Sequence, residues 1–250
     1  MAESGRVAGS ERESIVLLHG FGGTHRAWDG VLAHLPAERY RSLALDLPGH
    51  GDRVDAPRPI TFEGCVESVL ERSPERFAIA GYSMGGRIAL HVALAAAERV
   101  ERLVLISTTA GIEDPAERAF RREHDRRLAD EIEGDTIEMF SERWRAQPMF
   151  AEDPRGVDRL ARADQARNRP EGVAAALRGI GTGEMAPLWE RLSELGMPVT
   201  VVVGDRDVKF HALGRRVAES VADGTLVLAR GGHVLPIESP TAIVDALEGH

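Results

Sequence analysis

The stretch Gly-Tyr-Ser-Met-Gly-Gly at residues 81–86 follows an apolar, strand-like run at 77–80 and opens a helix-favouring run that ends near residue 96. A serine between two glycines at a strand-to-helix junction is the pattern of a nucleophile elbow. Glycines carry no Cβ, so the backbone can turn sharply and pack closely at Gly81 and Gly85. The helix that follows points its first amide groups toward any negative charge that develops beside Ser83. The stretch therefore predicts an activated serine at the end of a strand.

The rest of the chain alternates short apolar runs with segments of helix length. The predicted strands are 14–18, 41–45, 77–80, 102–106, 199–203 and 225–228, and the predicted helices are 26–35, 61–71, 84–96, 211–221 and 240–248. Short strands that are apolar along most of their length and alternate with helices are typical of a parallel sheet covered on both faces. We therefore predict the α/β fold class.

One segment, residues 111–195, breaks this alternation. It is rich in charged, helix-favouring residues, it is interrupted by prolines and glycines, and it contains no candidate strand. An insertion after a strand lies at the carboxyl edge of a parallel sheet, where ligands bind. We therefore predict a core made of residues 1–110 and 196–250, with residues 111–195 forming a helical cap over Ser83.

Composition limits the possible functions. A chain of 250 residues with 43% hydrophobic content suits one domain with a sizeable core. It contains no run of eighteen apolar residues, and the polar residues 1–13 are unlike a secretory signal, so we expect a cytoplasmic protein without a membrane span. A net charge of -9 argues against nucleic acid as a partner. The single cysteine, Cys65, is expected to be a buried packing residue, and a monomer is favoured over an oligomer.

A serine hydroxyl is a weak base and nucleophile until an imidazole accepts its proton, and a carboxylate must hold that imidazole. The sequence Gly-Asp-Arg-Asp at 204–207 follows one predicted strand and Gly-Gly-His at 231–233 follows the next, so both reach the sheet edge where Ser83 lies. We favour Asp207 over Asp205 as the acid because of its G-x-x-D spacing, and we expect Asp205 to cap the following turn or helix. His233 is the predicted base; the alternative is a loop histidine that only binds backbone groups.

An oxyanion site needs two backbone N–H groups directed at one point. His-Gly-Phe-Gly-Gly at 19–23 follows the first strong strand, so the amides of Phe21 and Met84 are the predicted pair. His19 is expected to brace its own loop. The sequence Asp-Leu-Pro-Gly-His-Gly at 46–51 is expected to be a structural turn on the other wall of the site.

Taken together, the motifs HGFGG, DLPGHG, GYSMGG, GDRD and GGH resemble those of the α/β-hydrolase superfamily from Ser14 onward. The resemblance implies the α/β-hydrolase fold: a mostly parallel sheet with helices on both faces and a helical cap. The residues before Ser14 leave little room for the two leading strands common in that fold. We therefore expect a sheet of about six or seven strands.

The cap and the residues that flank the motifs carry a narrower resemblance, to the MenH family of 2-succinyl-6-hydroxy-2,4-cyclohexadiene-1-carboxylate synthases. The segments that carry it are GYSMGGR at 81–87, ERAFRR at 117–122, WRAQPMF at 144–150, LRGIGTG at 177–183 and DVKF at 207–210. The resemblance implies a lyase of menaquinone biosynthesis that eliminates pyruvate from 2-succinyl-5-enolpyruvyl-6-hydroxy-3-cyclohexene-1-carboxylate. It implies no metal and no organic cofactor, and a Ser83 that takes a proton without being acylated.

The implied substrate is a small molecule with three carboxylates, which a protein of net charge -9 can attract only through cations gathered in a cleft. Arginine suits this role because it binds carboxylates through two parallel hydrogen bonds. The binding positions that the resemblance implies are Tyr82, Arg87, Arg121, Trp144 and Arg167.

Several of these assignments have alternatives. The spacing around Arg167 slips by about two residues against the family, so Arg162 or Arg169 could replace it. Arg121 could simply pair with Glu117 or Asp125, each four residues away on a helix. By periodicity alone Trp144 fits the core of the cap, and the asparagine that commonly follows the histidine in this family is Val234 here.

Two other functions fit the same residues. The first is a serine hydrolase, either a carboxylesterase or a carbon–carbon bond hydrolase, acting on a small acidic substrate with Ser83 as nucleophile or base. The second is a receptor without catalytic activity, in which the cap closes over a small ligand. An intact triad permits a receptor but does not favour it.

Overall fold

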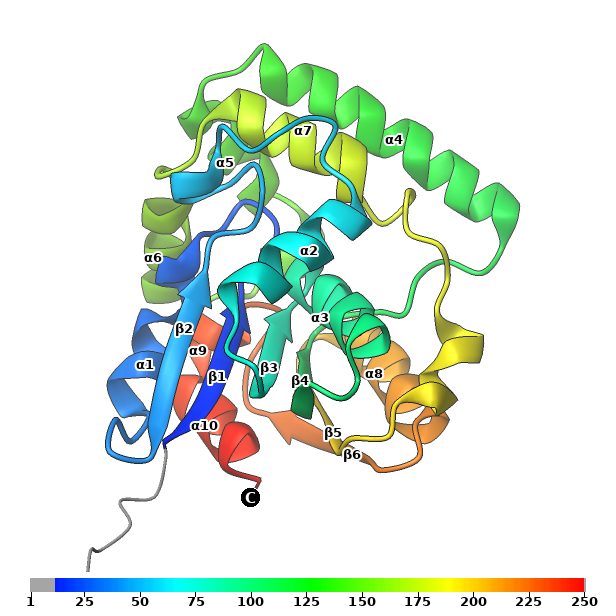
Figure 1. Ribbon diagram of the computed structural model, residues 1–250. Helices are drawn as coiled ribbons and strands as arrows, with labels where there is room; N and C mark the ends of the chain where they lie inside the picture. Colours follow the sequence, from blue (N-terminus) through cyan, green and yellow to red (C-terminus); the bar gives the residue numbers. More distant parts are fainter. Residues whose placement is uncertain (1–11, 250) are drawn as a thin grey trace, which may run out of the picture.

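A single parallel sheet forms the centre of the protein, whose structure is a computed structural model that describes residues 12–249. Its strands are β1 (Glu13–Leu18), β2 (Tyr40–Leu45), β3 (Phe77–Tyr82), β4 (Val100–Ile106), β5 (Val199–Gly204) and β6 (Gly224–Ala229). They lie in the order β2-β1-β3-β4-β5-β6, and each neighbouring pair is parallel (Figure 1). The predicted α/β fold with about six strands is confirmed. Of the polar stretch 1–13, residues 1–11 lie outside the described part.

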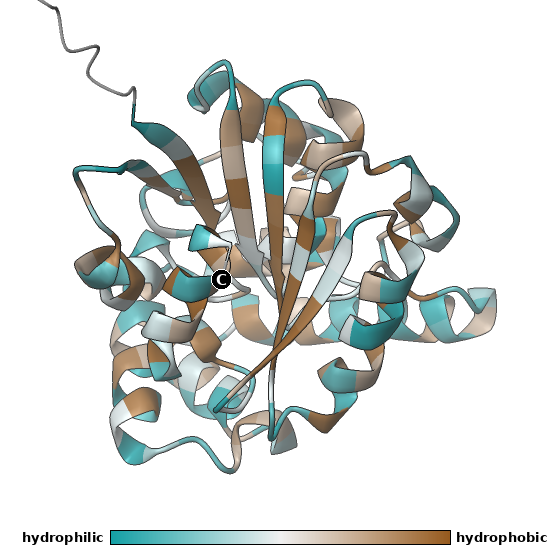
Figure 2. Ribbon diagram, turned by 90° about the horizontal axis from the view of Figure 1, so that it is seen from below, coloured by the Kyte–Doolittle hydropathy of each residue, from teal (hydrophilic) through white to brown (hydrophobic). Residues whose placement is uncertain are grey.

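The predicted strands all exist, but several run further than expected. β3 continues through Gly81 and Tyr82, which still pair with Leu105 and Ile106 of β4. Every residue of β3 is buried, as a strand covered on both faces requires, and the strands form the most hydrophobic layer of the molecule (Figure 2). The turn that carries Ser83 therefore starts directly from the centre of the sheet.

Helices cover both faces of the sheet. One face is packed by η1 (His25–Trp28), α1 (Asp29–His34), α9 (Leu235–Glu238) and α10 (Pro240–Glu248), and the other by α2 (Phe62–Arg72), α3 (Met84–Ala95) and α8 (Val208–Ser220). A short turn of helix, η2 (Gly51–Arg53), follows β2. Cys65 is buried within α2, where burial raises the pKa of its thiol to about 12. Within residues 12–249, no helix is both long and apolar enough to cross a membrane.

The segment between β4 and β5 is helical in the described chain and contains no strand. It comprises α4 (Pro115–Glu133), α5 (Ile137–Arg145), η3 (Pro148–Phe150), α6 (Arg155–Gln165), α7 (Pro170–Ile180) and η4 (Trp189–Glu194). Helices α4, α5 and α7 lie beyond the carboxyl ends of the strands (Figure 1) and share a small apolar cluster that includes Ile132, Phe140 and Leu177. We call residues 111–195 the cap.

The start of the longest cap helix follows from its sequence. The Asp114 carboxylate accepts a hydrogen bond from the Glu117 amide at 2.7 Å, and Pro115 occupies the first helical position. The end of the cap segment is different, because Trp189 and Leu192 of η4 join the main core beneath α3 and α8. The last residues of the segment therefore pack against the main core, and Trp189 also lines the cavity that contains Ser83.

Candidate active site

Ser83 occupies the turn between β3 and α3 in a backbone conformation that non-glycine residues rarely adopt, with φ 52° and ψ −107°. The turn is possible because glycines surround it. A Cβ on Gly81 would lie 2.3 Å from the Gly85 oxygen, and one on Gly85 would lie 2.2 Å from the Leu18 oxygen. The segment after β4 also holds this turn, because the Thr108 hydroxyl donates a hydrogen bond to the Ser83 carbonyl at 2.7 Å.

Three side chains from different strand ends meet at Ser83. The Ser83 hydroxyl lies 3.2 Å from His233 Nε2, and His233 Nδ1 lies 2.7 Å from Asp207 Oδ2. With Nδ1–H donating to the carboxylate, Nε2 is the acceptor for the serine proton. His233 and Asp207 are almost fully buried, with exposed fractions of 2% and 7%, so water does not compete for these bonds.

Asp205 has a different role from the one expected. Its Oδ1 accepts a hydrogen bond from the Gly231 amide at 2.9 Å, in the loop that carries His233. It does not cap the helix that follows, because α8 begins at Val208 with Asp207 in the N-cap position. Asp205 therefore braces the neighbouring histidine loop, a contact across two strands that local spacing could not reveal.

Aromatic side chains surround the histidine. The ring centroids of Phe210, Tyr82 and Phe150 lie 4.6, 5.4 and 6.0 Å from that of His233. Phe150 and Phe210 were not among the predicted site residues, although both stand in segments that carry the MenH resemblance. These rings reduce water access and so strengthen electrostatic interactions at the imidazole.

The Phe21 amide is directed by a tight turn. The Gly23 amide donates to the Gly20 carbonyl at 3.0 Å, and Gly22, at the third position of the turn, has φ +73°. Across a trans peptide the N–H points opposite to the C=O, so the Phe21 N–H points away from the inside of the turn. Within residues 12–249 this amide has no hydrogen-bond partner, and Phe21 lines the same cavity as Ser83.

The Met84 amide is available for a similar reason. Met84 is the first residue of α3, where backbone N–H groups have no acceptor within the helix. It too lines the cavity beside Ser83. The two residues predicted to form the oxyanion site thus line the same cavity as the serine.

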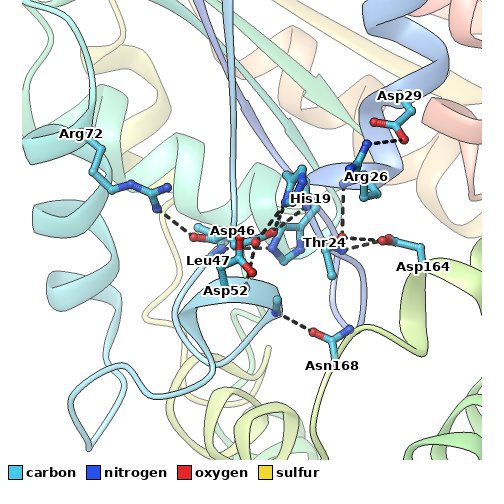
Figure 3. Close-up of polar contacts among 12 residues, drawn as sticks. His19, Thr24, Arg26, Asp29, Asp46, Leu47, Asp52, Arg72, Asp164 and Asn168 are labelled. Atoms are coloured by element: carbon cyan, nitrogen blue, oxygen red, sulfur yellow. Dashed lines mark hydrogen bonds and ion pairs between the residues drawn. The ribbon is translucent and has the colours of Figure 1, made fainter.

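Two buried, neutral histidines hold the turn at 20–23. His19 donates from Nδ1 to the Gly20 carbonyl at 2.8 Å and accepts from the Leu47 amide at 3.0 Å (Figure 3). His50 accepts at Nε2 from the Gly22 amide at 3.2 Å. Burial lowers the pKa of His19 to about 4 and that of His50 to about 3. The expected bracing by His19 is present, and His50 adds a second brace from the 46–51 turn.

A cavity of about 1210 Å³ separates the carboxyl edge of the sheet from the cap. Residues at the sheet edge and residues of the cap line it. They include the predicted site residues Ser83, Tyr82, Arg87, Arg121 and Trp144. The ring centroids of Trp144 and Phe21 lie 4.8 Å apart, and Trp144 also packs against the apolar cluster of the cap. Trp144 therefore belongs both to the wall of the cavity and to the cap core. The cap therefore covers the triad and contributes side chains to its surroundings.

Two arginines give this cavity a cationic wall. Arg87, which is 7% exposed, donates from Nη1 to the Ile180 carbonyl at 2.7 Å. Burial lowers the pKa of Arg87 to about 10, so its guanidinium remains charged at neutral pH. Arg121 donates from Nε to the buried Asp125 carboxylate at 2.8 Å, and its two Nη groups are not used in that bond. Arg121 therefore pairs with Asp125, not Glu117, and still lines the cavity.

Several acidic side chains also line the cavity, but most of them have cationic partners. Glu113 is bound by both Nη groups of Arg216, and Asp153 is bound by Arg145. Lys209, the only lysine in the sequence, lies on the rim of the cavity and was not singled out as a site residue. Among the described residues that line the cavity, Arg87 and Lys209 form no ion pair, and Arg121 keeps its two Nη groups outside its bond to Asp125, so these three cations can contact an anionic ligand.

The third predicted arginine lies away from the cavity in this structure. Arg167 is exposed and does not line the cavity, and neither do its alternatives Arg162 and Arg169. Arg162 pairs with Asp158 on its own helix. Arg167 lies in the junction between α6 and α7, where Asp164, Gln165 and Asn168 are buried and Arg167 is exposed.

Comparison with known proteins supports this architecture. The model of the Alpha/beta hydrolase family matches residues 15–246. A Bacillus subtilis (strain 168) protein named "Putative 2-succinyl-6-hydroxy-2,4-cyclohexadiene-1-carboxylate synthase" is 34% identical over 91% of this chain and 86% of its own length. The chain belongs to the alpha/beta hydrolase family and, within it, to the MenH family.

Other members of the MenH family are similar over nearly their whole length. The 2-succinyl-6-hydroxy-2,4-cyclohexadiene-1-carboxylate synthase of Salmonella agona (strain SL483) is 30% identical over 94% of this chain and 92% of its own. The structure of MenH from S. aureus superposes with a TM-score of 0.88 at 29% identity, covering 95% of this chain and 92% of that one. Similarity at this level includes the cap. Within residues 12–249, no group of three or more His, Cys, Asp and Glu side chains is arranged to hold a metal ion.

Proposed function

We propose that this member of the MenH family is a carbon–oxygen lyase of menaquinone biosynthesis. It eliminates pyruvate from 2-succinyl-5-enolpyruvyl-6-hydroxy-3-cyclohexene-1-carboxylate and yields 2-succinyl-6-hydroxy-2,4-cyclohexadiene-1-carboxylate. The observation that carries the proposal is a Ser-His-Asp triad that opens into a cavity with Arg87 and Arg121 on its wall. The relatives that bear the synthase name support it.

In this proposal Ser83 acts as a base. His233 Nε2, 3.2 Å from the serine hydroxyl, takes the serine proton as Ser83 Oγ removes a proton from the substrate ring. Asp207 stabilises the imidazolium that forms, through the bond to Nδ1. The amides of Phe21 and Met84 stabilise the negative charge that develops on a substrate oxygen. The electrons of that intermediate then form a new C=C bond in the ring as the bond to the enolpyruvyl oxygen breaks. The enolpyruvate that leaves takes the proton from the His233 imidazolium and tautomerises to pyruvate.

The charge balance under the cavity favours a substrate with carboxylates. Arg121 pairs with the carboxylate of Asp125, which is 2% exposed, and the charge of the same carboxylate also acts on Arg87 without forming an ion pair with it. Among the buried and half-buried groups at this wall, two guanidiniums face one carboxylate, because Asp114 and Glu117, which also line the cavity, are exposed to solvent. A buried charge is costly until it has a partner. A substrate carboxylate can supply that partner through the free Nη groups.

The decisive experiment supplies the purified protein with the enolpyruvyl cyclohexene substrate and follows pyruvate release. We expect turnover by the native enzyme and a loss of about a thousandfold or more in kcat for Ser83→Ala. No acyl-enzyme should accumulate when the reaction is quenched and the protein is weighed by mass spectrometry. No pyruvate release together with rapid hydrolysis of activated esters would replace the lyase by a serine hydrolase.

Three further predictions from the sequence stay predictions. They are a cytoplasmic location, a monomeric state, and the division into a core of residues 1–110 and 196–250 with a cap of residues 111–195. The absence of nucleic acid as a partner rests on the net charge of -9 alone.

A further inference from the structure

Two buried cap residues bind the loop that carries the Phe21 amide. Asp164, at the end of α6, accepts hydrogen bonds from the Thr24 amide at 2.9 Å and from the Thr24 hydroxyl (Figure 3). Asn168, in the short connection to α7, donates from Nδ2 to the Gly22 carbonyl at 2.7 Å. These residues lie 140 and 146 positions from their partners in the sequence. The junction between α6 and α7 thus holds loop 20–24 from the cap side.

Both donor hydrogens and the acceptor oxygen of the Asn168 side chain are engaged in hydrogen bonds. Besides the bond to Gly22, Nδ2 donates to the Gln165 carbonyl at 3.2 Å, and Oδ1 accepts from the Gly51 amide at 2.9 Å. The side chain is 5% exposed, so its amide cannot turn toward water without breaking these bonds. Asn168 therefore links the loop at 20–24 to the turn at 46–51, the two walls of the site.

Burying the Asp164 carboxylate costs free energy, because the carboxylate loses its hydration. Asp164 is 6% exposed, and burial raises the pKa of its carboxyl group despite the two bonds from Thr24 and the nearby charge of Arg167. An apolar side chain would fill the same place without that desolvation cost. Through its two hydrogen bonds, however, the carboxylate holds the backbone of Thr24 in one orientation.

The loop held in this way is the one that fixes the oxyanion site. Gly22 lies within, and Thr24 directly after, the turn whose Gly20–Gly23 bond points the Phe21 N–H away from the inside of the turn. His19 and His50 hold the same turn from the core, but their bonds reach only Gly20 and Gly22. Without the cap contacts, the Gly22 carbonyl and the Thr24 amide would be released together.

We propose that Asn168 and Asp164 are positioning residues for the oxyanion site, acting through loop 20–24 to keep the Phe21 N–H directed at the reacting oxygen. Neither residue lines the main cavity, so they act without touching the substrate. The inference rests on the proposed function only in its use of the Phe21 amide, which a lyase and a serine hydrolase would share. It makes the cap a contributor to catalysis as well as a cover.

The test compares Asn168→Ala with Thr136→Ala. Thr136 caps α5 through its hydroxyl, so both changes remove hydrogen bonds from the cap and both should lower the midpoint of urea denaturation, by more in Asn168→Ala because it loses three bonds of a buried side chain. We expect kcat for pyruvate release to fall about tenfold or more in Asn168→Ala with little change in KM, because a full oxyanion donor is worth about 100-fold or more. Thr136→Ala should leave kcat and KM at their native values.

A second readout separates this inference from the proposed function. A fluorophosphonate modifies the serine while its phosphonyl oxygen occupies the oxyanion site, so labelling of Ser83 depends on the Phe21 amide whatever the natural substrate is. We expect labelling to slow by a similar factor in Asn168→Ala and to stay unchanged in Thr136→Ala. If the native protein releases no pyruvate, the proposed function fails, while the labelling rates still decide this inference.

Asp164 offers an independent pair of variants, which also serves if Asn168→Ala does not fold. Asp164→Asn keeps one oxygen to accept from Thr24, whereas Asp164→Ala keeps none. We expect Asp164→Asn to recover most of the kcat and labelling rate lost in Asp164→Ala. Native values of kcat and labelling in Asn168→Ala, or equal losses in Asp164→Asn and Asp164→Ala, would overturn the inference.

Discussion

At the scale of single residues, the cationic wall distinguishes a lyase for a tricarboxylate from an esterase. A charged hydrogen bond to a carboxylate is worth about 1.5–3 kcal/mol, so Arg87→Ala and Arg121→Ala should each lower kcat/KM by about 10-fold to 100-fold. Arg121→Lys should recover only part of the loss, because a lysine lacks the planar fork of the guanidinium. The measurement is the initial rate of pyruvate release at several substrate concentrations.

The controls for this prediction use another residue and another substrate. Arg167→Ala removes an exposed arginine outside the cavity and should leave kcat/KM unchanged. Hydrolysis of a neutral activated ester by Arg121→Ala should stay near the native rate, since no carboxylate needs to be bound. If the ester and the tricarboxylate lose activity equally, Arg121 supports the shape of the site rather than recognising charge.

Sequence reasoning identified the residues whose roles follow from local motifs, and it missed those that depend on tertiary contacts. Ser83, Asp207 and His233 each follow a strand, so the parallel sheet brings them to one edge, where the structure has them within hydrogen-bond reach. Asn168 and Asp164 stand 140 or more residues from the loop that they hold, and no local pattern joins the two segments.

At the scale of elements, the turn after β3 depends on the absence of a side chain at Gly81. A Cβ there would meet backbone atoms at 2.3 and 2.5 Å, which cannot move without shifting the turn. We expect Gly81→Ala to lower the free energy of unfolding by about 3 kcal/mol and to abolish activity. Gly156→Ala in α6 is the control, because nothing lies within 4 Å of its Cβ, and it should raise stability by about 0.5–1 kcal/mol. Urea denaturation measures both, and similar midpoints for the two variants would contradict this account.

The positions of strands were easier to predict than the ends of helices. Strands of the buried sheet are apolar along their length, whereas helix boundaries depend on capping contacts. The predicted helix 26–35 is in fact η1 followed by α1, since the Thr24 hydroxyl accepts from the Arg26 amide and starts the first turn at His25. Likewise residues 185–195 belong to the charged segment by composition, but Trp189 and Leu192 pack on the core.

At the scale of the whole molecule, the buried histidines make stability depend on pH. The pKa of His19 is lowered to about 4 and that of His50 to about 3, both mainly by burial, while an unfolded chain keeps values near 6.5. The unfolded state therefore binds protons between pH 6.5 and 4 that the folded state refuses, so stability is complete above pH 6.5 and is lost as the pH falls. At pH 5 each of these two histidines lowers the free energy of unfolding by about 2 kcal/mol, because one pKa unit is worth about 1.4 kcal/mol.

We therefore expect the free energy of unfolding to fall by about 4 kcal/mol between pH 7 and pH 5, measured by urea denaturation at each pH. His91, whose pKa is also lowered by burial, acts in the same direction. His50→Gln should be less stable at pH 7 yet lose about 2 kcal/mol less on acidification, because glutamine does not titrate. Thr136→Ala provides the control: it removes the cap of α5, but threonine does not titrate, so this variant should keep the native slope. Equal stability of the native protein at pH 7 and pH 5 would mean that His19 and His50 are protonated in the folded state, and the turn that carries the Phe21 amide would then need another explanation.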